Sequence, residues 1–191
     1  AFFTIFYVPM VPIIIFLFKR KSLHWSVWPS VVLCLIGGYL LTNFYDATVR
    51  LGDGLVILGA LFWSTHIIFT GIIVIRYNLP LTIGAIQTLI VALFSFIIAS
   101  IYEEFIFDNI LKEIVSILYA GILSGGFAFV LQIFAQKNIT PAPAAIIFSL
   151  EGVFATIAAW FLLDQILGIN NLLGCFFILC GVMLLQLLPL K

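Results

Sequence analysis

Residues 143–163 read PAAIIFSLEGVFATIAAWFLL, an apolar stretch that carries a single charged residue, Glu151. About 20 apolar residues form a helix that spans the roughly 30 Å hydrocarbon layer of a bilayer. Only helices and closed barrels satisfy their backbone polar groups there, and a continuous apolar run excludes the alternating pattern of a barrel strand. The stretch therefore predicts a transmembrane helix with one carboxylate inside the membrane.

The rest of the chain has the same character. It is 64% hydrophobic and 8% charged, with a mean hydropathy of +1.31, whereas soluble domains carry roughly 25% charged residues. We predict an all-α fold, a polytopic transmembrane helix bundle with seven helices present. Residues 104–112, between two spans, fit either a short amphipathic surface helix or a plain loop. The predicted spans are 2–18, 29–45, 55–75, 83–102, 114–134, 143–163 and 169–189.

The charges between the spans are sorted by sign. Basic gaps favour the cytoplasmic side of a membrane, which predicts a cytoplasmic C-terminus and Ala1 near the outer face. The predicted location is the cell inner membrane. The net charge of zero leaves no basic stripe for nucleic acid. The predicted inner gaps carry Lys19, Arg20, Lys21, Arg76, Lys137 and Lys191, and the outer gaps carry Asp46, Asp53, Glu103, Glu104, Asp108, Glu113 and Asp164, with Arg50 and Lys112.

An internal repeat relates the two ends of the chain. Residues 1–45 align without gaps onto 145–189, so that Gly37 matches Gly181 and Leu40-Leu41 match Leu184-Leu185. An odd number of helices per repeat inverts the second copy, and inverted repeats with a site at their interface recur in secondary transporters. We therefore predict that 46–191 is a complete five-helix repeat, and that 1–45 holds the last two helices of an N-terminally truncated partner repeat.

Four motifs point to a family: Trp63-Ser-Thr-His66, Gln132-Ile-Phe-Ala-Gln136-Lys137, the stretch 143–155, and Gly174-Cys-Phe-Phe-Ile-Leu-Cys-Gly181. Together they resemble the EamA-type carriers of the drug/metabolite transporter (DMT) superfamily. The resemblance implies ten helices in two inverted five-helix repeats and export or exchange of small metabolites. The chain departs from the family at Gly152, where a proline usually follows the Glu, and at Asp164, where a Glu commonly ends the helix. We expect the glycine to leave this helix straighter.

Glu151 is the first candidate site residue. It lies about eight residues into its predicted span, roughly 12 Å deep at 1.5 Å per residue. A carboxylate at this depth is energetically costly, and such residues usually face a cavity or a partner. Proton coupling or the binding of a cationic solute is the functional interpretation. A structural hydrogen bond that locks two helices is the alternative.

His66 is predicted to reach a similar depth from the opposite face of the membrane. A pair of His66 with Glu151 would form a proton relay, and a histidine that only packs between helices is the alternative. Residues at helical spacing share its face. This site stripe comprises Gly59, Trp63, His66 and Thr70, and the side suited to lipid comprises Leu61, Ile68 and Ile72.

Three further residues complete the predicted substrate site. Gln87 and Gln132 offer amide hydrogen bonds to a polar solute, or they bridge helices. Tyr7 is placed opposite Glu151 by the repeat alignment. Gly121 and Gly125 have the small-xxx-small spacing that lets membrane helices approach closely, which predicts a packing role.

The predicted function is a membrane transporter of small organic solutes that works by alternating access, with proton coupling as an option. The alternative is a non-transporting sensor or a partner-binding subunit. An enzyme is not predicted, because no reactive pair has suitable spacing, and neither a cofactor nor a metal is expected. The three cysteines lie in apolar stretches, as small hydrophobes. The predicted partners are lipid, a small-molecule solute, protons and a second copy through the last helix, which offers Gly174, Cys175 and Gly181.

Overall fold

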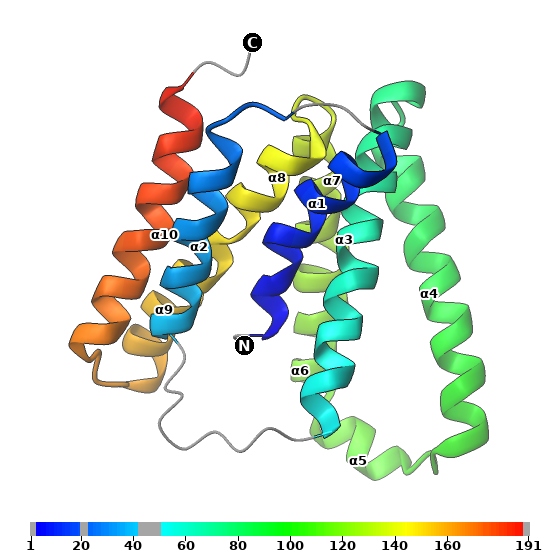
Figure 1. Cartoon of the computed structure of the whole chain (residues 1–191). Coiled ribbons are helices and arrows are strands. Elements are labelled where there is room, and N and C mark those ends of the chain that lie inside the picture. Colours follow the sequence, from blue (N-terminus) through cyan, green and yellow to red (C-terminus); the bar gives the residue numbers. More distant parts are fainter. Residues whose placement is uncertain (1–2, 20–22, 42–50, 189–191) are drawn as a thin grey trace. The chain divides into compact units, whose positions relative to one another are not determined.

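A computed structural model describes residues 3–19, 23–41 and 51–188. Within these ranges every regular element is a helix, so the all-α prediction is confirmed (Figure 1). The elements are η1 (Phe3–Phe6), α1 (Tyr7–Lys19), α2 (Val27–Leu41), α3 (Leu51–Tyr77), α4 (Pro80–Tyr102), α5 (Phe107–Lys112), α6 (Ile114–Leu118), η3 (Tyr119–Ala128), α7 (Phe129–Gln136), α8 (Pro141–Phe148), α9 (Leu150–Leu163) and α10 (Ile169–Leu187).

Five stretches of the described chain are long and apolar enough to cross a membrane, and each corresponds to a predicted span. The first two predicted spans are shorter apolar helices, Thr4–Phe18 and Val27–Leu41, and the predicted end of the second at residue 45 lies outside the described residues. The five long spans are Gly52–Tyr77, Pro80–Tyr102, Ile114–Gln136, Pro141–Leu163 and Ile169–Leu187.

Prolines and short polar residues set the helix ends. Pro80 and Pro141 occupy the first turn of α4 and α8, where a missing N–H does no harm, so these spans begin two or three residues before their predicted starts. Asn78 and Asp164 end α3 and α9 with positive φ of 56° and 49°, a conformation that their short side chains tolerate. Of the two options for 104–112, the structure has a short helix, α5.

The chain forms two compact units, which we describe separately. Unit 1 comprises residues 1–69 and 140–191, and unit 2 comprises 70–139. The predicted repeat boundary between residues 45 and 46 lies outside the described residues.

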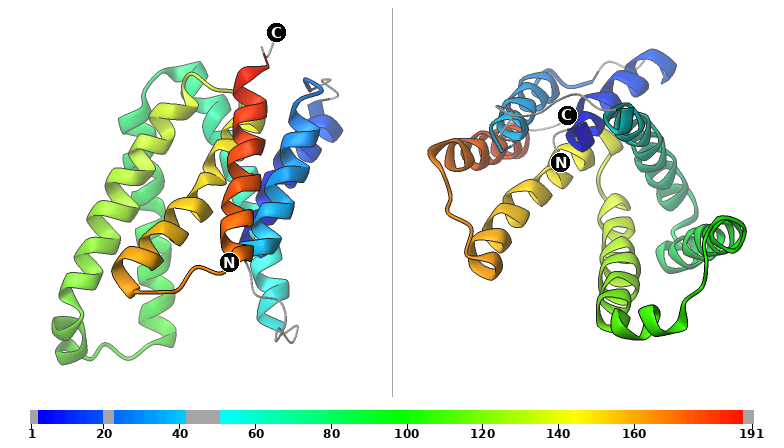
Figure 2. Two further views of the ribbon diagram at one scale, coloured as in Figure 1. Left: turned by 90° about the vertical axis from the view of Figure 1, so that its left-hand side faces the viewer. Right: turned by 90° about the horizontal axis from the view of Figure 1, so that it is seen from below.

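In unit 1, α2 and α10 lie side by side and run in opposite directions (Figures 1 and 2). Their backbones meet at glycines. A Cβ atom on Gly37 would lie 2.6 Å from the Gly174 carbonyl oxygen, and one on Gly181 would lie 2.9 Å from the Ser30 carbonyl oxygen. In the alignment of 1–45 with 145–189, Gly37 corresponds to Gly181 and Ser30 corresponds to Gly174. The two contacts are therefore equivalent under the repeat. The small face of α10 is therefore occupied within the chain, by α2.

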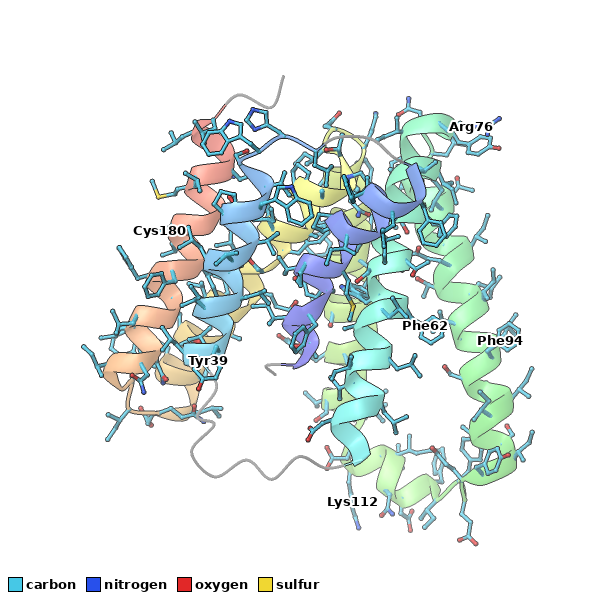
Figure 3. The ribbon with its side chains drawn as sticks, in the orientation of Figure 1. Tyr39, Phe62, Arg76, Phe94, Lys112 and Cys180 are labelled. Carbon is cyan, nitrogen blue, oxygen red and sulfur yellow. The ribbon has the colours of Figure 1, made fainter. Side chains whose placement is uncertain are left out.

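In unit 2, α4 contacts α7 near its own N-terminal end. A Cβ atom on Gly84 would lie 3.3 Å from side-chain atoms of Val130 and Ile133. Beyond this contact α4 is exposed, and Figure 3 shows Phe94 pointing away from it. Arg76 and Lys112 lie at opposite ends of the unit in the same view, as expected for a helix that crosses a membrane between them. Exposed apolar side chains on such a helix suit a lipid environment.

The packing role predicted for Gly121 and Gly125 is not seen within the described chain. Gly121 has open space around it, and the nearest atom to Gly125 is the Ala120 carbonyl oxygen in the same helix. Both residues belong to η3, which is a π-helix of ten residues. Glycines lower the preference for a regular α-helix, and π-helical segments often mark functional positions.

Candidate functional site

The helix that carries Glu151 is interrupted at Ser149. The Ser149 hydroxyl donates to the Ile146 carbonyl at 2.5 Å, and the Ser149 N–H donates to the same oxygen at 3.2 Å. The Gly152 N–H in turn donates to the Ser149 carbonyl at 3.1 Å. A serine that bonds back to its own helix tightens and bends that helix. The expectation that Gly152 leaves the helix straighter stays a prediction, because the interruption lies at Ser149 and not at Gly152.

The interruption is tied to α2 through a buried hydrogen bond. The Ser149 hydroxyl lies 3.3 Å from the Cys34 sulfur, and both side chains are buried. Cys34, Cys175 and Cys180 are all free thiols. Because Cys34 also borders Gly181 in the α2–α10 contact, the junction of α8 and α9 is anchored to the most closely packed part of unit 1.

Glu151 follows this interruption, in the first turn of α9 and near the middle of the 23-residue span. The N-terminal end of a helix carries a partial positive charge that stabilises a carboxylate. The side chain is exposed, and no described residue forms a hydrogen bond or ion pair with it. The alternative of a structural hydrogen bond between helices is thus not seen in this part of the chain, and the carboxylate is accessible.

Tyr7 is the predicted site residue at the start of α1. Its side chain is buried, with 6% of its surface exposed. Tyr7 begins α1 and Glu151 lies at the start of α9. The repeat alignment matches these same two residues, and α1 packs against α8, the helix that precedes Glu151 in the chain.

Ser64 connects this pair to α3 and was missed by the sequence analysis. Its buried hydroxyl donates to the Ala60 carbonyl at 2.7 Å and lies 3.4 Å from the Tyr7 carbonyl oxygen. Ser64 belongs to the Trp63–His66 motif, and Ala60 and Ser64 have small-xxx-small spacing. That spacing is the sequence signal that would have indicated a helix contact at this position.

Trp63 and His66 form a stacked pair on the same helix. Their ring centroids are 5.0 Å apart with an interplanar angle of 18°, and both side chains are half-buried. The buried side of α3 coincides only in part with the predicted site stripe, which shares Thr70 with it. Ile68, which was predicted to face lipid, is only 6% exposed, and Gly59, which was predicted to belong to the site, has open space around it.

Ile68 was predicted to face lipid because periodicity alone does not tell which polar or small residues of α3 contact another helix. In the structure α3 contacts α1 on the side that carries Ser64. The proposed relay between His66 and Glu151 stays a prediction. The buried side of α3 in unit 1 comprises Ala60, Ser64, Ile67 and Ile68.

Three predicted site residues lie in unit 2. Thr70 is buried, and Gln87 and Gln132 are half-buried. The two glutamines come from α4 and α7, the helices that meet at Gly84. The amide nitrogen of Gln132 is buried and has no hydrogen-bond partner among the described residues, so it is a donor that remains to be satisfied.

Comparison with known proteins gives a consistent result. The sequence model of the EamA-like transporter family matches residues 50–187. The chain is 28% identical over 143 residues to the Uncharacterized transporter YoaV of Bacillus subtilis (strain 168), covering 72% of this chain and 47% of that protein. It is 27% identical over 187 residues to an Uncharacterized transporter of Archaeoglobus fulgidus, covering 98% of this chain and 59% of that protein. The chain thus spans about half the length of these relatives. No solved structure matches it.

Proposed function

The chain belongs to the EamA-like transporter family, and from this premise we propose that it acts as a membrane carrier of small organic solutes by alternating access. The observation that carries the proposal is the accessible carboxylate of Glu151, which directly follows the interruption of its membrane helix at Ser149. Interrupted helices whose ends face the bilayer midplane are a common way to build substrate sites in secondary transporters.

The arrangement of unit 1 supports a solute site on α1, α3 and α9. Glu151 supplies a carboxylate at the start of α9, and Ser64 holds α3 against the backbone of Tyr7 on α1. A charged residue inside a membrane usually faces a cavity or a partner. Because no described residue neutralises Glu151, a proton or a solute is the partner that this proposal assigns to it.

A non-transporting sensor or partner-binding subunit has less support. Such a module would present small or polar residues outward on an end helix. On α10 the glycines of this kind, Gly174 and Gly181, already contact α2. A second copy of the chain would therefore have to dock on another side of α10. Our proposal is a transporter and not an enzyme, in the cell inner membrane with a cytoplasmic C-terminus.

The test is solute counterflow in liposomes that contain the full chain. A panel of radiolabelled amines, amino acids, nucleosides and sugars is loaded at several pH values. We expect Glu151→Gln to abolish the pH dependence of transport, because an amide neither binds a proton nor carries charge. Glu104→Gln is the matched control, since Glu104 is exposed in the segment between α4 and α5 and should transport normally. Unchanged transport and pH response in Glu151→Gln would remove Glu151 from the mechanism.

A further inference from the structure

The span 114–136 of unit 2 changes its helix type within the membrane. It begins as α6, continues as η3, a π-helix of ten residues, and ends as α7. Both ends of η3 join regular helix, since Leu118 and Phe129 have right-handed α dihedral angles. In a π-helix the paired N–H and C=O groups are five residues apart instead of four, and such segments are rare and frequently lie at functional sites. The ten π-helical residues therefore require an explanation.

Two glycines allow η3 to adopt the π conformation. A Cβ atom on Gly125 would lie 3.2 Å from the Ala120 carbonyl oxygen, and one on Gly126 would lie 3.3 Å from the Gly121 carbonyl oxygen. Each of these oxygens is five residues back in the chain, which is the spacing of π-helical pairing. Contacts this short are tighter than most Cβ contacts in proteins. A side chain at either position would therefore crowd the π-helix, whereas alanine favours the α-helix.

The two halves of this span differ in their packing. The end formed by α7 is held against α4, because a Cβ atom on Gly84 would lie 3.3 Å from side-chain atoms of Val130 and Ile133, and Ile133 is fully buried. In contrast, every residue from 114 to 124 is exposed, and so is every residue of α4 from 88 to 98. One half of the span is therefore fixed to α4, and the other half, residues 114–124, has room to move. We call residues 114–124 the free half.

We propose that η3 is a hinge, at which the free half swings towards α4 and away from it while α7 stays fixed. Turns of η3 convert between the π and α forms during this motion. Each converted turn rotates the residues before it by about 100° and shifts them by about 1.5 Å along the axis, the step of one α-helical residue. Sharp bends in helices occur at π-helical turns and at Gly/Ser pairs, and Ser124 directly precedes the two glycines. This inference rests on the proposed transport function and deepens it, because it names an element that opens and closes one end of the path.

Distances between two spin labels in the full chain, measured by double electron–electron resonance in liposomes, test the hinge. The hinge pair, Ile117→Cys with Ile98→Cys, joins the free half to α4. The control pair, Phe134→Cys with Leu81→Cys, joins α7 to α4. All four positions are exposed and accept a label. Gel filtration of each labelled protein confirms that it is folded. The native thiols are removed beforehand by Cys34→Ser, Cys175→Ala and Cys180→Ala.

We expect the distances of the hinge pair to fall into two populations and those of the control pair into one. The double variant Gly125→Ala/Gly126→Ala should change the ratio of the two populations by a factor of about 5–30, because each alanine favours the α form. Gly121→Ala is the matched control, since a Cβ atom there meets nothing within 4 Å. It should change the ratio by a factor of only about 2–5, from helix preference alone.

The hinge and the carrier fail in different ways. A single narrow distance for the hinge pair, the same in the wild type and in the double variant, would overturn the hinge. Equal broadening of the hinge pair and the control pair would also overturn it, because the motion would then not be centred on η3. Two populations in a chain that gives no counterflow of any solute in the panel would overturn the carrier and leave the hinge motion in place. Two populations together with counterflow that the double variant slows would support both.

Discussion

The contact between α2 and α10 makes a sharp prediction about Gly174→Ala. The new methyl group would lie 2.7 Å from the Gly37 carbonyl oxygen and 2.8 Å from Cγ of Leu41. Both distances fall well short of the 3.4 Å at which ordinary van der Waals contact begins, and neither atom is the free end of a flexible side chain. The helices must therefore move apart by about 0.7 Å, and overpacking of this kind typically costs about 1–3 kcal/mol.

For a chain of this length that cost corresponds to a fall in melting temperature of about 2–12 °C. The assay is thermal unfolding of the detergent-purified protein, followed by the loss of its gel-filtration peak. Gly59→Ala is the matched control, because a Cβ atom there meets nothing within 4 Å and alanine favours a helix over glycine by about 0.5–1 kcal/mol. A Gly174→Ala protein as stable as Gly59→Ala would refute the close approach. The double variant Gly37→Ala/Gly174→Ala should lose less stability than the sum of the two single variants, because one separation of the helices relieves both clashes.

Two further predictions concern α3 and unit 2. Ser64→Ala removes the buried hydroxyl that contacts the Tyr7 carbonyl, and should lower stability by about 0.6 kcal/mol, the mean for polar contacts between membrane helices. Thr65→Ala, which removes a bond within its own helix, should have a smaller effect on thermal unfolding, and an equal effect would contradict the contact. Cysteines introduced by Arg76→Cys and Lys112→Cys should react with an impermeant maleimide from opposite sides of the membrane, since the two residues lie at opposite ends of unit 2. Labelling of both from one side would argue against a membrane crossing between them.

The fold class was predictable because lipid imposes a simple rule. A stretch of about 20 apolar residues in a membrane has to be a helix. In the structure each predicted span contains a helix. The helix ends were less predictable. Pro80 and Pro141 looked like turn residues, yet both lie within the first turn of a helix. Local sequence does not tell whether a proline precedes a helix or begins it, because both positions need no backbone N–H.

The candidate site was predicted only in part. The prominence of Glu151 follows from charge alone, since a carboxylate in an apolar run stands out. The side of α3 that faces α1 does not follow from periodicity, because Ser64 and Ile68 each fit either side of that helix. The interruption at Ser149 was also missed. A serine interrupts an apolar helix only when its hydroxyl donates back to a carbonyl of the preceding turn, as the Ser149 hydroxyl does to the Ile146 carbonyl. The sequence does not reveal whether this bond forms.

The glycines of α2 and α10 also explain how two helices stay together in a solvent as oily as they are. Each Cβ position that would clash with a carbonyl oxygen is occupied in glycine by a hydrogen. The Gly37 hydrogen therefore points at the Gly174 oxygen and the Gly174 hydrogen at the Gly37 oxygen, at Cβ-to-oxygen distances of 2.6 and 2.7 Å. Such Cα–H···O contacts are worth about 0.5–1 kcal/mol each. This mutual attraction between backbones does not depend on the exclusion of water. It therefore holds the two helices together in lipid, where the hydrophobic effect does not drive helix association.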